Sequence, residues 1–555
     1  MTHEVITLQF GNYSNYIGTH YWNIQQSQFV YSSEINLKAI PDLNHDVLFR
    51  EGINSQNKYT YSPRVILFDL KDNVNEYKSH NGSVNVNKEK ESIGTWKGDL
   101  KVFESEKKPI APYSIDLELS ELEQMDWEKM QKHGQEPTSH MKEEYDMDEQ
   151  VKYWSDYSNV KFNDRSYMLI NQYDTATIEN EPFDLYNYGL NVFKENSLMD
   201  DFENNLRHYS EECDNVQGFQ FMVDSFNGFG GMASKALTSI NEEFPKLPLF
   251  TFLSFPFFDT HKVENNTLKL INTALTLKNI LSEKSENVVV PLSLFNSFYL
   301  SKEINPICLP HVKYKPELEY HTSAILASLI DSVTLPWRQK SQKSFMHDMI
   351  DLMDVYKYKI ANLQAIFPLN LGEKYLYDYL QDNDIFKTSH SFTPFSSVNH
   401  LSKTDDTNQA GAFSIMCRGV PDKLVKNPSD NFYFKGIISA YSLLDKYSID
   451  MYPKSRSKCF SIDTPLNVNL PYPNIIDTNN SMNHNRNIKN LNKETSLMTN
   501  LQMNKSILGF VKFVNDNAEK CNFNKQTKYF ENGLEMDDFI ELNAFNKDLV
   551  DMYSV

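Results

Sequence analysis

Cysteine is scarce in this chain, and its five cysteines are scattered without any CxxC spacing. They stand at Cys213, Cys308, Cys417, Cys459 and Cys521. Structural zinc sites need ligands at short, regular spacings, and disulfide frameworks belong to oxidising compartments. The sequence therefore supports neither a disulfide framework nor a zinc site, and we expect the protein in a reducing compartment.

The chain also lacks a long hydrophobic run and a targeting leader. Its longest apolar stretch is Leu247–Phe258, which contains Pro248 and Pro256. A bilayer needs about 20 consecutive apolar residues, so we predict a buried strand there instead. Residues 1–5 have no basic region and no apolar core, and the first arginine is Arg50. We therefore expect a cytoplasmic protein without a transmembrane segment, or one that docks on an organelle from its cytosolic side.

Positive charge is in short supply. The chain has 54 lysines and arginines against 74 aspartates and glutamates, a net charge of −20. Nucleic-acid binders usually present a basic surface, so we expect no nucleic-acid partner. Solvated acidic faces explain the excess more simply than an acidic partner-binding surface. Hydrophobic residues make up 40% and aromatic residues 13%, which excludes wholesale disorder. At roughly 150 residues per domain, the length predicts about three to four domains.

Strands and helices alternate along the chain. Residues 4–10 alternate apolar and polar side chains, a polar turn follows at 11–15, and apolar residues then recur at helical spacing. A second buried strand is predicted at 64–70. Further on, helices are predicted at 323–335 and 345–363. This order is typical of a doubly wound α/β fold with a parallel sheet.

A second polar turn lies between the predicted strand 218–224 and the next helix. It contains Gly228, Gly230 and Gly231, and we expect Gly230 to need a positive φ angle. Turns of this kind, at helix N-termini, bind phosphates in Rossmann-like sheets. No Gly-Lys-Ser/Thr follows, so this is not a Walker loop.

Taken together, these segments resemble tubulin. The opening Glu4–Gly18 resembles its first strand, phosphate loop and helix, and Pro63–Leu70 resembles its next strand and acidic loop. Gly218–Gln220, leading into Gly228–Gly231, is similar to the approach to tubulin's glycine-rich signature. Cys417–Gly419 and Gly533–Phe539 resemble later landmarks. The order matches over most of the chain.

The opening carries Tyr13–Asn15, then Gly18–His20 and Trp22, and Trp154–Asp156 follows a long insertion. On these residues the chain is identified as a member of the Misato family within that superfamily. The implied fold is a tubulin-like α/β protein, a Rossmann-like parallel-sheet nucleotide-fold domain with a smaller α/β domain and a C-terminal helical hairpin. The residues that would line the nucleotide loops are Gly11, Asn12, Asn15, Gly228, Gly230 and Gly231.

The expected domain layout has four parts. Residues 1–320 form the tubulin-like N-terminal domain, and residues 71–150 are a mobile acidic and polar surface insertion with at most a short helix near 114–130. Residues 321–472 form an intermediate α/β domain with a connecting helix. An Asn-rich flexible loop at 473–500 precedes the C-terminal helical hairpin at 501–555, whose two helical segments are split at 531–533.

Departures from tubulin predict that the nucleotide site is vestigial. Phe229 stands where a phosphate-binding hydroxyl belongs, and Lys71 replaces a carboxylate of the magnesium shell. Leu292 and Ser323 replace the two base-reading asparagines. Asp351 is the analogue of the water-activating glutamate, which we interpret as a surface residue. We therefore expect no catalytic residue, no metal and no cofactor, with GTP as the alternative ligand.

Other catalytic signatures are absent from the sequence. Its histidines, such as His261 and His321, have no HxxxH or HExxH spacing, and Ser225 has no Gly-x-Ser-x-Gly elbow.

Three functions remain open. The Misato resemblance implies a non-enzymatic cytosolic protein that acts in mitochondrial distribution, morphology and organisation from the outer face of mitochondria. The retained glycines allow a GTP-binding assembly protein with a residual nucleotide switch. A partner of tubulin or its chaperonin machinery in spindle formation is also implied by the family and is compatible with the first function.

Overall fold

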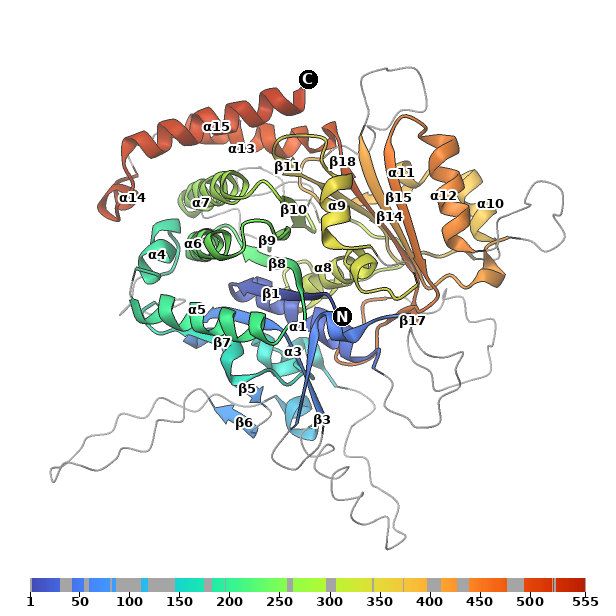
Figure 1. Cartoon of the computed structure of the whole chain (residues 1–555), viewed down its shortest axis with the longest axis horizontal. Coiled ribbons are helices and arrows are strands. Elements are labelled where there is room, and N and C mark those ends of the chain that lie inside the picture. The colour runs from blue at the N-terminus through green and yellow to red at the C-terminus, as the bar shows by residue number, and fades with distance from the viewer. Residues whose placement is uncertain are drawn as a thin grey trace, which may run out of the picture.

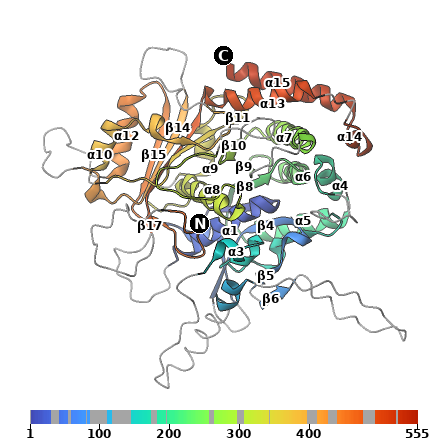
Figure 2. The ribbon, with the colours of Figure 1, turned by 180° about the vertical axis from the view of Figure 1, so that it is seen from behind.

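The computed structural model contains two main sheets (Figures 1 and 2). The first is built from strands between residues 4 and 360, and the second from strands between residues 362 and 503. It describes residues 2–29, 42–53, 59–79, 82–85, 111–117, 145–173, 182–194, 196–256, 263–295, 306–341, 344–372, 374–396, 411–426, 439–476, 494–521, 523 and 526–554.

The first sheet has seven parallel strands in the order β11-β10-β9-β8-β1-β4-β7. Its strands are β1 (Glu4–Phe10), β4 (Val65–Leu70), β7 (Tyr167–Ile170), β8 (Val216–Asp224), β9 (Leu249–Phe255), β10 (Asn287–Ser293) and β11 (Lys359–Ile360). The two strands predicted first, β1 and β4, pair directly, with Phe10 opposite Phe68. The predicted α/β class with a Rossmann-like parallel sheet is confirmed. The apolar run at 247–258 contains the buried strand β9, as predicted.

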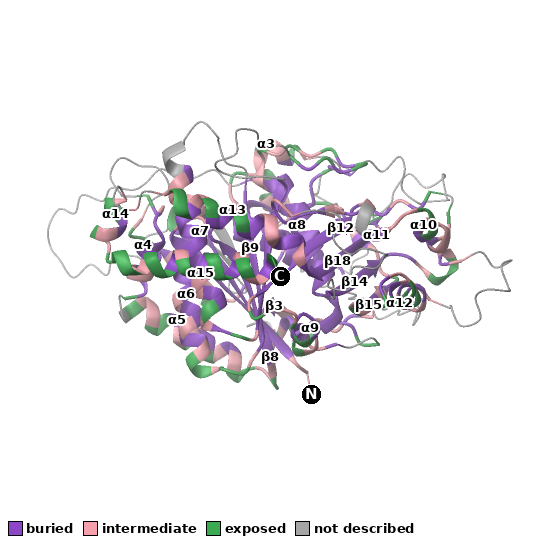
Figure 3. Ribbon diagram, turned by 90° about the horizontal axis from the view of Figure 1, so that it is seen from above, coloured by how far each residue is buried: buried purple, intermediate pink, exposed green. Residues whose placement is uncertain are grey.

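Helices cover both faces of this sheet. Successive strand residues face opposite sides, so Val5 packs with α1 and α8 whereas Ile6 packs with α6, α7 and the C-terminal helices. The helices are α1 (Asn12–Gln26), α4 (Tyr186–Val192), α5 (Asn196–Glu211), α6 (Gly228–Glu243), α7 (Val263–Glu283), α8 (Glu319–Val333), α13 (Leu508–Lys520), α14 (Thr527–Glu531) and α15 (Met536–Ser554). Figure 3 shows exposed residues on the outer sides of α5, α7 and α15. Helices α1 and α8, in contrast, are buried over nearly their whole length. The predicted C-terminal hairpin is α13 and α15, which lie against α7.

The second sheet has five strands in the order β13-β12-β18-β14-β15. They are β12 (Asn362–Ile366), β13 (His390–Ser391), β14 (Ala412–Arg418), β15 (Arg456–Ile462) and β18 (Leu497–Met503), and α10 (Leu376–Asp382), α11 (Ile385–Thr388) and α12 (Ala440–Met451) accompany them. One face of this sheet shares a continuous core with α8 and the first sheet.

The smaller strand pairs are β2 (Phe49–Ile53) with β3 (Tyr59–Pro63), β5 (Glu76–Ser79) with β6 (Gly82–Asn85), and β16 (Leu466–Asn467) with β17 (Glu494–Thr495). The Asn-rich loop expected at 473–500 is wrong at its end, because residues 494–500 form β17 and the start of β18. Residues 477–493 of that loop lie outside the described residues.

The helix predicted over 345–363 is wrong in its second half. Helix α9 spans only Met346–Leu352, and the chain then enters β11 and β12. Residues Lys359 and Ile360 pair in parallel with Val288 and Val289 of β10. Pairing with the open edge of the sheet therefore overrides the local helical pattern.

The described parts of the segment 71–150 include core residues. Val74, Tyr113 and Met147 are buried in the same cluster as α1 and α8. Residues 112–117 are helical, and the short helix α3 spans Met147–Gln150. Residues 86–110 and 118–144 lie outside the described residues, so the expected surface insertion is anchored to the core at three points.

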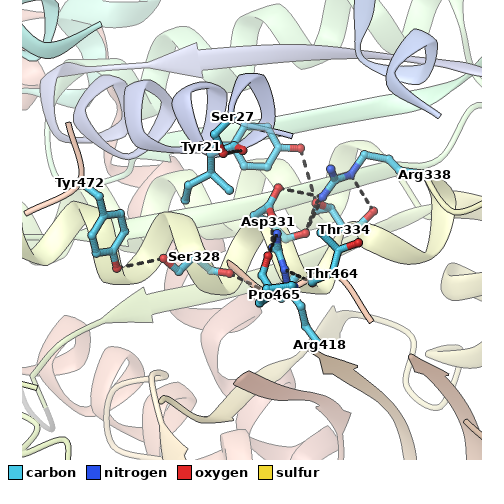
Figure 4. A network of polar contacts seen from close by, with 12 residues as sticks. Tyr21, Ser27, Ser328, Asp331, Thr334, Arg338, Arg418, Thr464, Pro465 and Tyr472 are labelled. Carbon is cyan, nitrogen blue, oxygen red and sulfur yellow. Dashed lines mark hydrogen bonds and ion pairs between the residues drawn. The ribbon is translucent and has the colours of Figure 1, made fainter. Parts of the chain in front are cut away.

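A buried ionic cluster joins α8 to the second sheet (Figure 4). Asp331 on α8 is fully buried, and both Arg338 and Arg418 pair with its carboxylate. Arg338 Nη2 lies 2.9 Å from Asp331 Oδ1, and Arg418 at the end of β14 donates to Asp331 Oδ2. Arg418 also donates to the carbonyl oxygens of Thr464 and Pro465, at 3.3 Å each. The cluster thus ties the linking helix to β14 and to the loop after β15.

None of the described helices is long and apolar enough to cross a membrane.

Candidate nucleotide site

The strand order reverses at β1, with β4 on one side and β8 on the other. In open α/β sheets ligands bind at such a switch point, beyond the carboxyl ends of the strands. The candidate site therefore lies where Gly11 and α1 follow β1, Asp69 stands in β4 and Asp224 ends β8. The first residue of α8, Glu319, faces the same place through Asn12, whose Nδ2 donates to Glu319 Oε2 at 3.2 Å.

At the start of α1 the backbone N–H groups point at a carboxylate of the chain itself. Tyr13 N donates to Asp224 Oδ2 and Ser14 N to Asp224 Oδ1, each at 2.9 Å. The hydroxyls of Ser14 and Ser254 also donate to Oδ1, at 2.7 and 2.8 Å. Gly11 has φ +107°, and a Cβ there would lie 2.4 Å from Asp224 Oδ2. Gly11 is therefore required here both for its backbone angle and for the approach of Asp224.

The second buried carboxylate, Asp69, is fully engaged by protein donors. Asn15 Nδ2 and Trp154 Nε1 donate to its Oδ2 at 2.9 and 2.8 Å. Asn73 Nδ2 and the backbone N–H of Leu70 donate to its Oδ1 at 2.7 and 2.8 Å. Asp69 thus joins β4 to α1 and to the turn η4 (Trp154–Tyr157). Lys71, predicted to alter a metal shell, is exposed at the start of the turn that follows.

Three carboxyl groups share this region, and each has a raised pKa. Burial raises the pKa of Asp224 to about 7, against the opposing effect of its hydrogen bonds from Ser14, Ser254 and Tyr13. Burial likewise raises the pKa of Asp69 to about 6. Burial, with the nearby charges of Asp224 and Asp69, raises the pKa of Glu319 to about 7. A raised pKa means that a carboxyl group keeps its proton to higher pH, so these groups are partly protonated near neutral pH.

The glycine-rich turn is closed by direct packing. Helix α6 begins at Gly228, and Asn227 Oδ1 caps it by accepting from Phe229 N at 3.0 Å. A Cβ on Gly230 would lie 2.1 Å from Thr276 Oγ1, and one on Gly231 would lie 2.0 Å from the carbonyl oxygen of Tyr186. These glycines let α6 approach α4 and α7, a role that phosphate binding does not require.

Phe229 and its neighbours fill the space beside that turn. The Phe229 side chain is buried and packs edge-to-face on Phe183, with ring centroids 4.9 Å apart. A Cβ on Gly228 would lie 2.6 Å from the Phe183 ring. The expected positive φ at Gly230 is wrong, because Gly228, Gly230 and Gly231 all belong to the first turn of α6. Their small size, rather than an unusual backbone angle, explains why glycine stands there.

The structure separates the predicted site residues into two groups. Gly11, Asn12 and Asn15 lie at the start of α1, whereas Gly228, Gly230 and Gly231 lie in the packed start of α6. Whether any of them contacts a nucleotide stays a prediction.

The structure also shows where the residues that differ from tubulin lie. Leu292 is buried in β10 and Ser323 in α8. Asp351 lies on α9, which packs near the start of β8, so it is at the opposite end of that strand from Asp224. Its exposed side chain pairs with His347 at 3.7 Å.

The sequence interpretation missed Asp224 and Glu319. Asp224 did carry a signal, because a charged residue stands at the end of a buried strand there, as Asp69 does near the end of β4. Glu319 carried none, since it and the neighbouring Glu317 look alike at the point where α8 begins. Among the residues that the structure describes, no group of three or more His, Cys, Asp or Glu side chains could hold a metal ion.

Comparison with known proteins identifies two successive regions. Residues 3–119 match the Misato Segment II tubulin-like domain, and residues 144–339 match a tubulin domain. Protein misato homolog 1 of Homo sapiens is 29% identical over 492 residues, covering 86% of this chain and 84% of the relative. Protein misato of Drosophila melanogaster is 25% identical, covering 85% and 83%. Protein DML1 of Gibberella zeae is 28% identical, covering 63% of each chain. The chain therefore carries a Misato Segment II tubulin-like domain followed by a tubulin domain, and it is similar over most of its length to the misato proteins.

Proposed function

We propose that this protein is a non-enzymatic member of the tubulin-like superfamily that works without binding GTP at its switch point. The observation that carries the proposal is the closure of the glycine turn. Gly231 lies against the Tyr186 carbonyl, Gly230 against Thr276, and Phe229 is buried on Phe183. A loop that cradles phosphates must leave its backbone N–H groups open to the ligand.

The competing function is a GTP-dependent assembly protein with a residual switch. Gly11 and Asn15 match the nucleotide loop of tubulin, but in this structure both make contacts within the protein. Gly11 makes room for Asp224, and Asn15 donates to Asp69 and to the carbonyl oxygen of Phe68. These contacts favour a protein that works without binding GTP over a GTP-dependent assembly protein.

For the cellular role, we propose that the protein acts in mitochondrial distribution, morphology and organisation from the cytosolic face of the organelle. The Misato relationship supports this role. A second role on tubulin or its chaperonin machinery during spindle formation is compatible with it. Cytoplasmic localisation with association to mitochondria follows from the same proposal.

Fractionation of cells that express the full chain tests the cellular role. We expect part of the protein to sediment with intact mitochondria and to be degraded when protease is added outside them, as an outer-membrane marker with a cytosolic domain would be. A matrix protein serves as the protected control. Absence from the mitochondrial fraction, or protection equal to that of the matrix control, would contradict a role at the cytosolic face.

A further inference from the structure

Four hydrogen-bond donors at the switch point converge on one carboxylate of the chain. The backbone N–H groups of Tyr13 and Ser14 and the hydroxyls of Ser14 and Ser254 all donate to Asp224, at 2.7–2.9 Å. The backbone donors belong to the first turn of α1, a helix of 15 residues. A helix N-terminus directly after the first strand is where this type of fold places the phosphate of a ligand.

We propose that Asp224 is an internal anion that occupies the phosphate position at the start of α1 and keeps this crevice closed. The proposal rests on the proposed function and adds the contact that enforces it. Asp224 comes from β8, on the far side of the switch point from β4, so folding itself brings the anion to the helix. Gly11 completes the arrangement, because any Cβ there would meet the Asp224 carboxylate.

The turn η4 fills the neighbouring part of the crevice, between α1 and the start of α8. The Tyr157 hydroxyl donates to the carbonyl oxygen of Tyr16 at 2.8 Å, and Asn23 Nδ2 donates to the Tyr157 carbonyl oxygen at 2.9 Å. The Tyr157 ring lies 4.5 Å from His20 and 5.0 Å from Tyr320, measured between ring centroids. Tyr157 is fully buried. The protein thus supplies both an anion and aromatic rings to its own crevice.

A simpler interpretation is that Asp224 only caps α1. Asn caps helices about as well as Asp, so a pure cap would tolerate Asp224→Asn. An internal anion would not, because a carboxamide carries no charge to the helix N-terminus and turns an N–H₂ group toward donors. The two interpretations therefore predict different stabilities for Asp224→Asn, the variant that keeps the size of the side chain.

The experiment measures thermal unfolding of the full chain with sodium formate added at constant ionic strength and at about pH 8.5. Burial raises the pKa of Asp224 to about 7, so the side chain is a carboxylate anion at that pH. Asp224→Gly removes the carboxylate and leaves space for formate, the smallest carboxylate. We expect this variant to melt below the wild type, and formate to raise its midpoint by about 2–4 °C more than it raises the wild-type midpoint. Asp224→Asn should also melt lower, but formate should not restore it because the carboxamide fills the space.

Two controls keep the result interpretable. Ser254→Ala removes one donor and keeps the carboxylate, so formate should act on it as on the wild type. If Asp224→Gly does not fold by itself, its refolding yield with and without formate becomes the measurement, and formate should increase that yield. Equal effects of formate on Asp224→Gly and wild type, or wild-type stability of Asp224→Asn, would overturn the internal anion. Neither outcome depends on GTP, so the proposed function is tested separately.

Discussion

Replacement of Gly231 by alanine is expected to destabilise the N-terminal domain by about 1–3 kcal/mol, the range for overpacked sites. The added Cβ would lie 2.0 Å from the carbonyl oxygen of Tyr186 and 3.2 Å from the backbone nitrogen of Leu190. Both atoms belong to the backbone of α4, so relief requires a shift of the whole helix. Helix propensity alone predicts the opposite sign, because Ala is favoured over Gly by about 1 kcal/mol. Urea denaturation of the purified chain measures the difference.

The neighbouring glycine supplies the control. A Cβ on Gly230 would lie 2.1 Å from Thr276 Oγ1, a side-chain atom that can be removed. Gly230→Ala should therefore destabilise the protein, and the double variant with Thr276→Ala should recover part of the loss. No such partner exists for Gly231. Unchanged or increased stability of Gly231→Ala would show that α6 and α4 are not in this close contact.

Removal of the charge at Asp331 is expected to cost about 3–5 kcal/mol, the range for breaking a buried ion pair from one side. Asp331→Asn leaves Arg338 and Arg418 side by side without their shared carboxylate, and both guanidinium groups are buried. Because Arg418 belongs to β14, the contact between α8 and the second sheet should weaken first. Urea denaturation gives the loss of stability, and proteolysis should show faster cleavage of the second sheet.

Asp351→Asn is the matched control for this substitution. Asp351 pairs with His347 at the surface, with 64% of its side chain exposed. Exposed pairs contribute roughly 0–1 kcal/mol, so this variant should unfold almost as the wild type does. A loss at Asp331 as small as that at Asp351 would mean that the buried cluster does not hold α8 to the second sheet.

Much of the fold could be predicted from sequence because its signals are local. The alternation in β1, the apolar run of β4 and the polar turn at Gly11 each lie within a few residues. The break at 531–533 was equally visible, and Gly533 indeed has φ +95°. The second break in the tail was missed, because α13 already ends at Lys520 and α14 begins at Thr527. The failure at 345–363 has a tertiary cause, since β11 exists only because β10 offers an edge.

The candidate site was harder to predict because its contacts join distant positions. Ser14 and Asp224 are 210 residues apart in sequence. No local pattern indicates that the Asp224 carboxylate will lie at the start of α1. The same glycines can cradle a phosphate or admit a neighbouring helix, and only the positions of Tyr186 and Thr276 decide between the two roles. Substitutions such as Phe229 predict a degenerate site. They did not indicate that Asp224 would accept hydrogen bonds from the start of α1, or that Phe229 would pack on Phe183.

Calorimetric titration of GTP with magnesium into the purified full chain tests the central claim most directly. The same titration into Phe229→Thr tests whether a restored hydroxyl is enough for GTP binding. We expect that it is not, because Asp224 still accepts hydrogen bonds from the backbone N–H groups at the start of α1. We predict no binding for either protein at GTP concentrations up to about 1 mM, a limit near −4 kcal/mol. A micromolar dissociation constant for the wild type, about −8 kcal/mol, would contradict the account and restore the GTP-dependent assembly protein.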